Sequence, residues 1–309
     1  MLRVLTSVNF MTIATAKLGV LLLACLLVSV QVHAQIMAQS NERPTKAQTI
    51  LVSVHPMALL VKSAWPRLSV SSLVSANQSP HDFVLKPSDM KRIVRSDAVV
   101  WMGKGFEPYL QKVLRDAEQV DLSESIHTSE LNHEKHDQHQ VEDDHSKHNH
   151  DPHLWLDPNM ILTMLAQIQN RLSLPEPTVF IDAYKTWQQV AMAQLMDHKS
   201  TGFVSFHDAF REWIDTYELN QLAVVTNNPE KPVGTRHVIK VRNILASGKA
   251  KCLFVEPQFQ SRIVPKLHKG LDIEVIKIDP MASAYSISDA QFIDFYQELL
   301  SKFTQCFSE

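Results

Sequence analysis

Glycine and cysteine are scarce in this chain of 309 residues, which contains seven glycines and three cysteines. No stretch matches GxxxxGK[ST] or GxGxxG, so the common phosphate-cradling loops are excluded. A chain of this length can bury cores of its own, which excludes a tiny scaffold held together by disulfides. The net charge of -3 and the pI near 6.6 give no basic footprint for nucleic acid. HExxH is absent as well, which excludes the usual metalloprotease motif.

The first 34 residues predict a secretory signal peptide. They contain Arg3 and Lys17 and no acidic residue, and a nearly unbroken apolar run over 18–30 ends close to Ala34. This run is shorter than the roughly 20 residues that a membrane-spanning helix needs, and no later run is long enough. We therefore expect cleavage near Ala34 and a periplasmic mature chain that does not insert directly into the membrane.

Cleavage at that point would remove Cys25 and leave the pair Cys252 and Cys306. In an exported, oxidising setting such a pair predicts a disulfide, and two buried free thiols are the alternative. Closing a loop of this length stabilises the fold by roughly 4 kcal/mol in the chain-entropy model.

Short apolar runs rich in β-branched residues recur along the chain, and each leads into a helix-like stretch. These runs cover 49–54, 68–74 and 98–101 in the first half and 203–206, 222–225, 253–255 and 273–278 in the second. The alternation predicts an α/β fold with two doubly wound domains. In such sheets ligands bind beyond the carboxyl ends of the strands, so polar residues at those ends are the first candidates for a site.

Residues 178–197 contain no glycine or proline and carry apolar residues at helical spacing. They predict one long, rigid helix that joins the two domains, with an ordinary surface helix inside one domain as the alternative. The predicted divisions are an N-terminal domain over 35–175, a linker helix over 176–199 and a C-terminal domain over 200–309.

Histidine is abundant, and eight of the fifteen histidines lie in 127–153 together with seven acidic residues. A segment so poor in apolar residues cannot bury enough surface to order itself, so we predict a disordered acidic insertion over 121–152. Flexible imidazoles and carboxylates make a weak chelator of zinc, copper or nickel; a merely solvated charged loop is the alternative. The candidate accessory ligands are His127, His133, His136, His139, His145, His148 and His150.

Four other candidate ligands lie in ordered surroundings. His81 and His207 follow strand-like runs, His153 stands where the insertion ends, and Asp279 ends a strand-like run. Each alone is a weak signal, because a single strand-end histidine is more often a packing residue. Two come from each half of the chain, so a cleft between the domains could gather all four as a metal site.

Four segments resemble the signatures of the zinc-binding solute receptors of bacterial ABC importers, the ZnuA-like cluster. They are HDFVLKPSDMKRI at 81–93, HLWLDP at 153–158, FVSFHDAF at 203–210 and KCLFVEPQFQ at 251–260. The resemblance implies two α/β domains joined by a long helix and a zinc site in the cleft. It further implies delivery to an inner-membrane permease, with no catalysis. By motif match His81, His153 and His207 are the ligands, and Asp279 is a carboxylate that some relatives use as a fourth.

Some zinc members of this group place a carboxylate just before the first ligand histidine, where this chain has Pro80. The fourth ligand therefore stays open between water, Asp279 and a histidine of the insertion. Manganese-type relatives have a carboxylate where His207 stands, which favours zinc here. Three imidazoles suit Zn²⁺ at about 2.0 to 2.1 Å, whereas Mn²⁺ prefers oxygen ligands.

Glu256 is a candidate partner behind the ligands, because metal-bound imidazoles usually donate their other N–H to a carboxylate or carbonyl. His55, at another strand end, is a candidate for the same shell or for a structural role. The sequence thus predicts a monomeric, high-affinity zinc-binding component of an ABC transporter. A manganese or iron receptor of the same fold is the first alternative, and an exported zinc hydrolase or a metal-regulated surface protein is a more distant one.

Overall fold

The computed structural model describes residues 48–123, 153–259 and 261–308. The predicted signal peptide with its cleavage near Ala34 lies outside the described residues, as do the seven accessory histidines between His127 and His150. Residues Gln48–Glu309 group into one compact unit, which therefore holds every candidate ligand outside the insertion.

The N-terminal half of this unit is a four-stranded parallel sheet with the strand order β2-β1-β3-β4. Its strands are β1 (Thr49–Val52), β2 (Ser69–Ser72), β3 (Ala98–Trp101) and β4 (Gln119–Asp121). The intervening helices are α2 (His55–Ala64), α3 (Pro87–Arg95) and α4 (Pro108–Gln111), with the 3₁₀ turn η1 (Pro80–Asp82) before α3. In the central strand Leu51 lies beside Ser71 of β2 and Val99 of β3. Each helix follows a strand, as crossover connections between parallel strands require.

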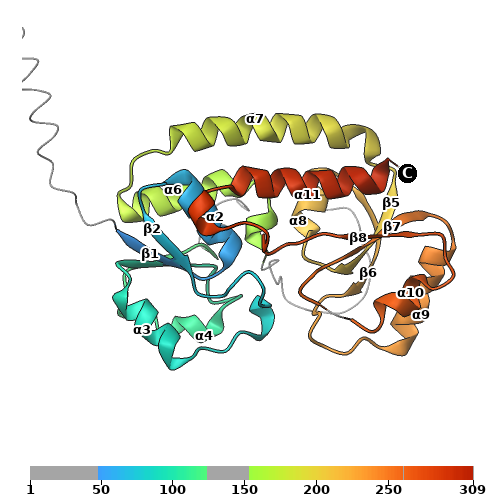
Figure 1. The fold of residues 1–309 in the computed structure, drawn as a ribbon, viewed down its shortest axis with the longest axis horizontal. Helices are drawn as coiled ribbons and strands as arrows, with labels where there is room; N and C mark the ends of the chain where they lie inside the picture. The colour runs from blue at the N-terminus through green and yellow to red at the C-terminus, as the bar shows by residue number, and fades with distance from the viewer. Residues whose placement is uncertain (1–47, 124–152, 260, 309) are drawn as a thin grey trace, which may run out of the picture. The chain divides into compact units, whose positions relative to one another are not determined.

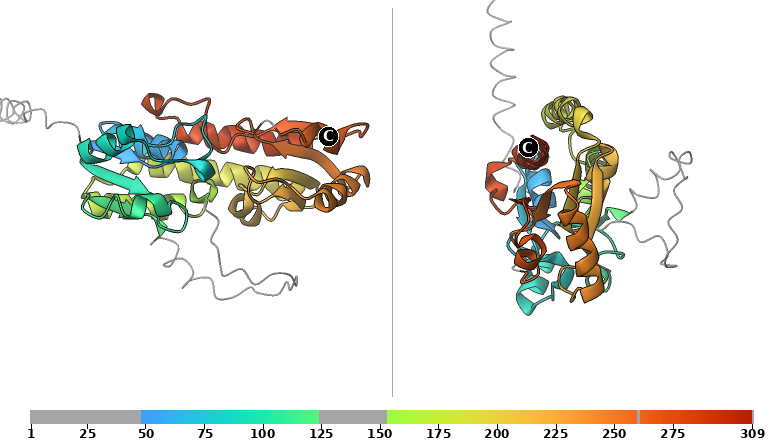
Figure 2. Two further views of the ribbon diagram at one scale, coloured as in Figure 1. Left: turned by 90° about the horizontal axis from the view of Figure 1, so that it is seen from below. Right: turned by 90° about the vertical axis from the view of Figure 1, so that its right-hand side faces the viewer.

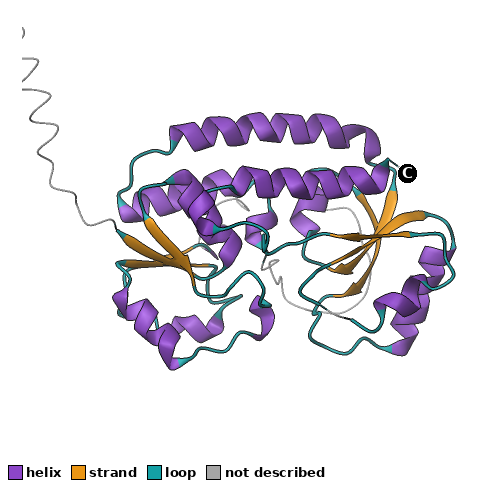
Figure 3. Ribbon diagram, viewed as in Figure 1, coloured by secondary structure: helices purple, strands orange, loops and turns teal. Residues whose placement is uncertain are grey.

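The C-terminal half repeats this plan with the strand order β6-β5-β7-β8, again all parallel (Figures 1 and 3). Its strands are β5 (Gly202–His207), β6 (Asn220–Thr226), β7 (Ala250–Val255) and β8 (Glu274–Lys277). Its helices are α8 (Arg211–Thr216), α9 (Thr235–Ala246) and α10 (Val264–His268). The predicted α/β fold with two parallel sheets is confirmed. All seven predicted strand runs are strands, whereas β4 was not predicted, because it is only three residues long and contains a single apolar side chain.

Three longer helices complete the described fold, with the short turn η2 (Leu154–Leu156) before them. They are α6 (Ile161–Leu172), α7 (Thr178–Leu195) and α11 (Phe292–Phe307). The turn η3 (Met196–His198) follows α7, and the turn η4 (Ile287–Asp289) precedes α11. The helix predicted over 178–197 is therefore present. Its role as a connector between domains, like the domain boundaries themselves, stays a prediction.

Helices α7 and α11 lie alongside each other (Figures 1 and 2). Helix α11 also contacts α2 from the N-terminal half and both β7 and β8 from the C-terminal half. One buried cluster accordingly contains residues of both sheets, among them Val52, Phe203 and Phe254. Its aromatic centre is formed by Tyr184 of α7 and Tyr296 of α11, both with no exposed surface. The two sheets thus share one core through these two helices.

Among the described residues, no helix combines the length and the apolar character that a membrane span needs.

The predicted disulfide is confirmed. Cys252 in β7 is bonded to Cys306 in α11, 54 residues further along the chain. Both side chains are buried, so the bond attaches the last helix to the C-terminal sheet from inside the core.

Replacing one partner, Cys306→Ser, is expected to lower the free energy of unfolding by about 4 kcal/mol. The unfolded chain then regains the freedom of an open loop. Denaturant titration of the variant and of wild type, each with and without reductant, measures the effect. Reduced wild type should approach the variant; equal midpoints for oxidised wild type and variant would contradict the prediction.

Candidate metal site

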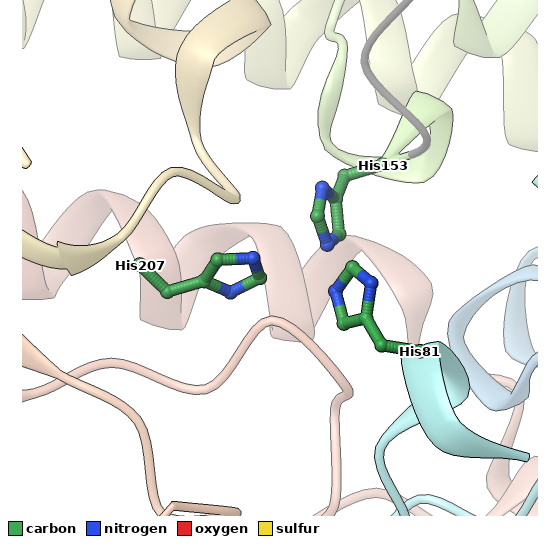
Figure 4. Close-up of side chains that lie close together, drawn as sticks. All are labelled: His81, His153 and His207. Atoms are coloured by element: carbon green, nitrogen blue, oxygen red, sulfur yellow. The ribbon is translucent and has the colours of Figure 1, made fainter. Parts of the chain in front are cut away.

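Three of the four predicted ligands converge. His81, His153 and His207 each offer one ring nitrogen, and these three atoms lie within 4.8 Å of one another. The ring centroids are 5.3 Å apart for His81 and His153 and 5.0 Å apart for each of the two other pairs. The rings point toward a common centre from three different segments (Figure 4). His153 and His207 are buried and His81 is half-buried, so the group is largely shielded from bulk water.

Each histidine is held by the local structure around it. His81 lies in η1, where its backbone N–H donates to Ser79 Oγ at 3.3 Å. His153 directly precedes η2, and its carbonyl accepts the N–H of Leu156 at 2.8 Å. His207 is the last residue of β5 and pairs in register with Thr226 of β6. One strand end and two tight turns thus carry the three imidazoles, and each of these backbones is held by hydrogen bonds of its own.

The orientation of His207 is set by a buried carboxylate. Its Nδ1 lies 2.9 Å from Glu256 Oε1, and both side chains are almost fully buried. Because a carboxylate can only accept, Nδ1 carries the proton and the lone pair of Nε2 is left for a metal ion. Glu256 thus contacts His207, while its role behind a metal ligand stays a prediction; outer carboxylates of this kind raise the basicity of a metal-binding nitrogen.

The geometry fits a tetrahedral ion that is bound by nitrogen. Two nitrogens bound to the same zinc at about 2.0 to 2.1 Å are roughly 3.3 Å apart. The three nitrogens, all within 4.8 Å of one another, would therefore close in by no more than about 1.5 Å for any pair. Three imidazoles without a carboxylate are a donor set for borderline cations such as Zn²⁺ rather than hard ones.

The other two predicted site residues lie outside this group. Both carboxylate oxygens of Asp279 accept hydrogen bonds from its own half of the chain, from Gln258, Met281 and Ser283. His55, the first residue of α2, has its Nε2 2.9 Å from the carbonyl of Tyr285. Burial lowers the pKa of His55, although this carbonyl and the charge of Asp279 act in the opposite direction. The structure thus gives both residues protein partners.

Comparison with protein-family models matches residues 50–306 to the family described as "ZnuA: Zinc-uptake complex component A periplasmic". The chain belongs to this family.

A curated relative carries the name of this family, and solved structures share the fold. The chain is 29% identical over 289 residues to the "High-affinity zinc uptake system protein ZnuA" of Haemophilus ducreyi, covering 84% of this chain and 93% of the relative. A crystal structure of a zinc-bound ZnuA deletion mutant superposes with a TM-score of 0.67 at 20% identity, covering 85% and 99% of the two chains. FpvC of Pseudomonas aeruginosa in complex with Mn²⁺ also gives 0.67, at 17% identity over 85% and 99%. At these identities the two structures show a shared fold.

In this ZnuA-family chain an aromatic wall surrounds the histidines, and the sequence did not single it out. The ring of Phe106 is 5.9 Å from that of His81, Trp155 is 5.2 Å from His153, and Phe259 is 6.0 Å from His207. Apolar walls exclude water and strengthen the interaction between ligand nitrogens and a cation. Trp155 and Phe259 lie inside the segments HLWLDP at 153–158 and KCLFVEPQFQ at 251–260, and this was the only signal for them.

Phe106 is carried by a loop with a buried acid. Glu107 has no exposed surface, its Oε2 accepts the N–H of Met102 at 2.7 Å, and its own N–H donates to the carbonyl of Gly103 at 2.8 Å. Gly103 has φ of 98°, and a Cβ there would lie 2.5 Å from Asp121 Oδ1, so only glycine fits. Burial raises the pKa of Glu107 to about 8, against the lowering effect of its hydrogen bonds.

Removing the charge of the carboxylate behind His207, in Glu256→Gln, is expected to weaken zinc binding about tenfold. The amide still accepts from Nδ1, but it stabilises the metal-bound imidazole less. Chelator competition at neutral pH measures the affinity. The matched control is Glu274→Gln, a half-buried acid at the start of β8 that is outside the histidine group. Equal effects of the two variants would contradict the role of Glu256.

Glu107 should make stability fall as pH rises. Between its ordinary value of 4.5 and about 8 the folded state holds a proton that the unfolded state releases. The free energy of unfolding then decreases by at most about 1.4 kcal/mol per pH unit across this window. Glu107→Gln mimics the protonated acid and should remove that contribution. Denaturant titrations of both proteins between about pH 5 and pH 8 compare the slopes, and parallel pH profiles would contradict the raised pKa.

Proposed function

We propose that this chain is the high-affinity zinc receptor of an ABC transporter. It captures Zn²⁺ in the periplasm with His81, His153 and His207 and delivers it to the permease in the inner membrane. The observation that carries this proposal is the convergence of three imidazole nitrogens within 4.8 Å. No bond of the cargo is made or broken, so the protein acts as a carrier and not as an enzyme.

The donor set supports zinc over manganese as cargo. The fold alone does not choose, since a structure of the same fold was solved with Mn²⁺. Zinc forms stable tetrahedral sites with imidazole, whereas Mn²⁺ favours carboxylate, carbonyl and water oxygens. Within the described ranges, the group of candidate ligands contains three histidines and no carboxylate. The names of the curated relatives, which are zinc uptake proteins, point in the same direction.

The test compares the zinc affinity of the full mature chain, purified without a histidine tag, with that of the single variant His207→Ala. Both affinities are measured by zinc titration. Loss of a ligand should weaken binding by more than the 10- to 100-fold that loss of an outer partner typically costs. His237→Ala is the matched control, because His237 is exposed and its Nε2 lies 2.8 Å from the carbonyl of Val224. Competition between Zn²⁺ and Mn²⁺ for the wild-type chain then shows which of the two ions binds more tightly.

Tight zinc binding that survives His207→Ala would contradict the site, and preference for Mn²⁺ would contradict the cargo.

A further inference from the structure

Asp279 lies two residues after Lys277, the last residue of β8, and both of its carboxylate oxygens accept hydrogen bonds from neighbouring groups. Its Oδ1 accepts from Gln258 Nε2 at 2.6 Å and from the backbone N–H of Met281 at 2.8 Å. Its Oδ2 accepts from the N–H of Ser283 at 2.7 Å and from Ser283 Oγ at 2.5 Å. Two carboxylate oxygens have about four acceptor sites, so these four bonds use the capacity of the group. A metal ion could bind Asp279 only by displacing them.

The hydrogen bonds that Asp279 accepts hold the loop that follows it, and this loop contacts Trp155. Ala282 adopts a left-handed backbone with φ of 54°, which a residue with a Cβ rarely adopts. The N–H groups on both sides of Ala282 donate to the one carboxylate, which holds the loop in this form. In the same loop the carbonyl of Pro280 accepts the indole N–H of Trp155 at 2.8 Å, in a buried hydrogen bond.

Trp155 in turn supports His153, which lies two residues before it. The two rings are 5.2 Å apart, and Trp155 has no exposed surface. Its backbone carbonyl accepts the hydroxyl of Tyr296 from α11 at 2.7 Å. Trp155 is thus fixed at its ring by Pro280 and at its backbone by Tyr296, which leaves the turn that carries His153 little freedom.

Asp279 is also connected to His207, through Gln258 and the nearby Glu256. Gln258, which donates to Asp279 Oδ1, lies two residues after Glu256, which accepts from Nδ1 of His207. The short segment 256–258 therefore makes one hydrogen bond to a candidate ligand and one to Asp279. The contacts that support His153 and those that support His207 thus both include the carboxylate of Asp279.

We propose that Asp279 is a positioning residue that couples the placement of His153 to that of His207, and that it is not the fourth ligand of the metal. This inference rests on the proposed zinc site. It predicts that changes at Asp279 and at the Trp155 indole act along one path: Asp279 shapes the loop, the loop holds the indole, and the indole holds the turn of His153.

The test uses the full mature chain with Asp279→Asn, Trp155→Phe and the double variant. Each single change should weaken zinc binding about tenfold, at the lower end of the effect of outer partners. The double variant should lose little more than Asp279→Asn alone, because residues in one network are not additive. At saturating Co²⁺, used as a coloured substitute for zinc, Asp279→Asn should keep the band positions of wild type, since the ligand set is unchanged.

Trp101→Phe is the matched control for the tryptophan change. Trp101 is 3% exposed and its indole nitrogen, although buried, has no hydrogen-bond partner. It packs in a different cluster from Trp155. The same loss of ring volume without loss of a hydrogen bond should leave zinc affinity unchanged.

A readout without metal separates this inference from the proposed function. In the metal-free protein, Asp279→Asn should speed hydrogen exchange of the Trp155 indole N–H and leave that of Trp101 unchanged. This comparison holds even if the wild-type chain binds no zinc, an outcome that would overturn only the proposed function. Shifted Co²⁺ bands in Asp279→Asn, additive affinity losses, or unchanged exchange at Trp155 would each overturn the positioning role.

Discussion

Three imidazoles can bind one cation only if the segments that carry them are held at a suitable separation before the cation arrives. His81 lies in the turn η1 between β2 and β3, His153 directly precedes the turn η2, and His207 ends a strand of the C-terminal sheet. The separation of these segments depends on the shared core beneath them, where α11 contacts α7, α2, β7 and β8. Since ordering loose segments costs conformational entropy, a pre-assembled site binds its ion more tightly than flexible ligands would.

The electrostatics of the site follow from the same packing. Imidazoles bind a metal in their neutral form and add no charge of their own, so the buried carboxylate of Glu256 would offset part of the charge of a divalent ion bound by His207. The aromatic rings of Phe106, Trp155 and Phe259 keep the surroundings apolar. Partial compensation of the ion's charge in an apolar setting suits a carrier that has to hold its cargo and later release it, because no excess of negative ligands traps the ion.

Much of the fold and of the candidate site could be predicted from local sequence pattern. Continuous apolar runs such as Thr49–Val52 and Ala98–Trp101 are strands because a parallel sheet is buried on both faces. The motif segments identified the three histidines, and the even cysteine pair indicated the disulfide. Strand β4 (Gln119–Asp121) was missed because its order comes from pairing with β3 and not from its own composition. Helix α11 was missed as the shared support of both sheets, since its eight buried hydrophobic side chains specify a face but not what covers it.

The alternation of strands and helices, the donor atoms available for a metal and the pair of cysteines that could bond all follow from the amino-acid sequence alone. These are properties of residue type and short-range spacing. In contrast, tertiary packing brings three donors together while Asp279 is engaged by Gln258, Met281 and Ser283. The partner of Glu256 and the aromatic wall were decided in the same way. Contacts between residues that are tens of positions apart depend on how the sheets and helices pack, and no local pattern encodes that packing.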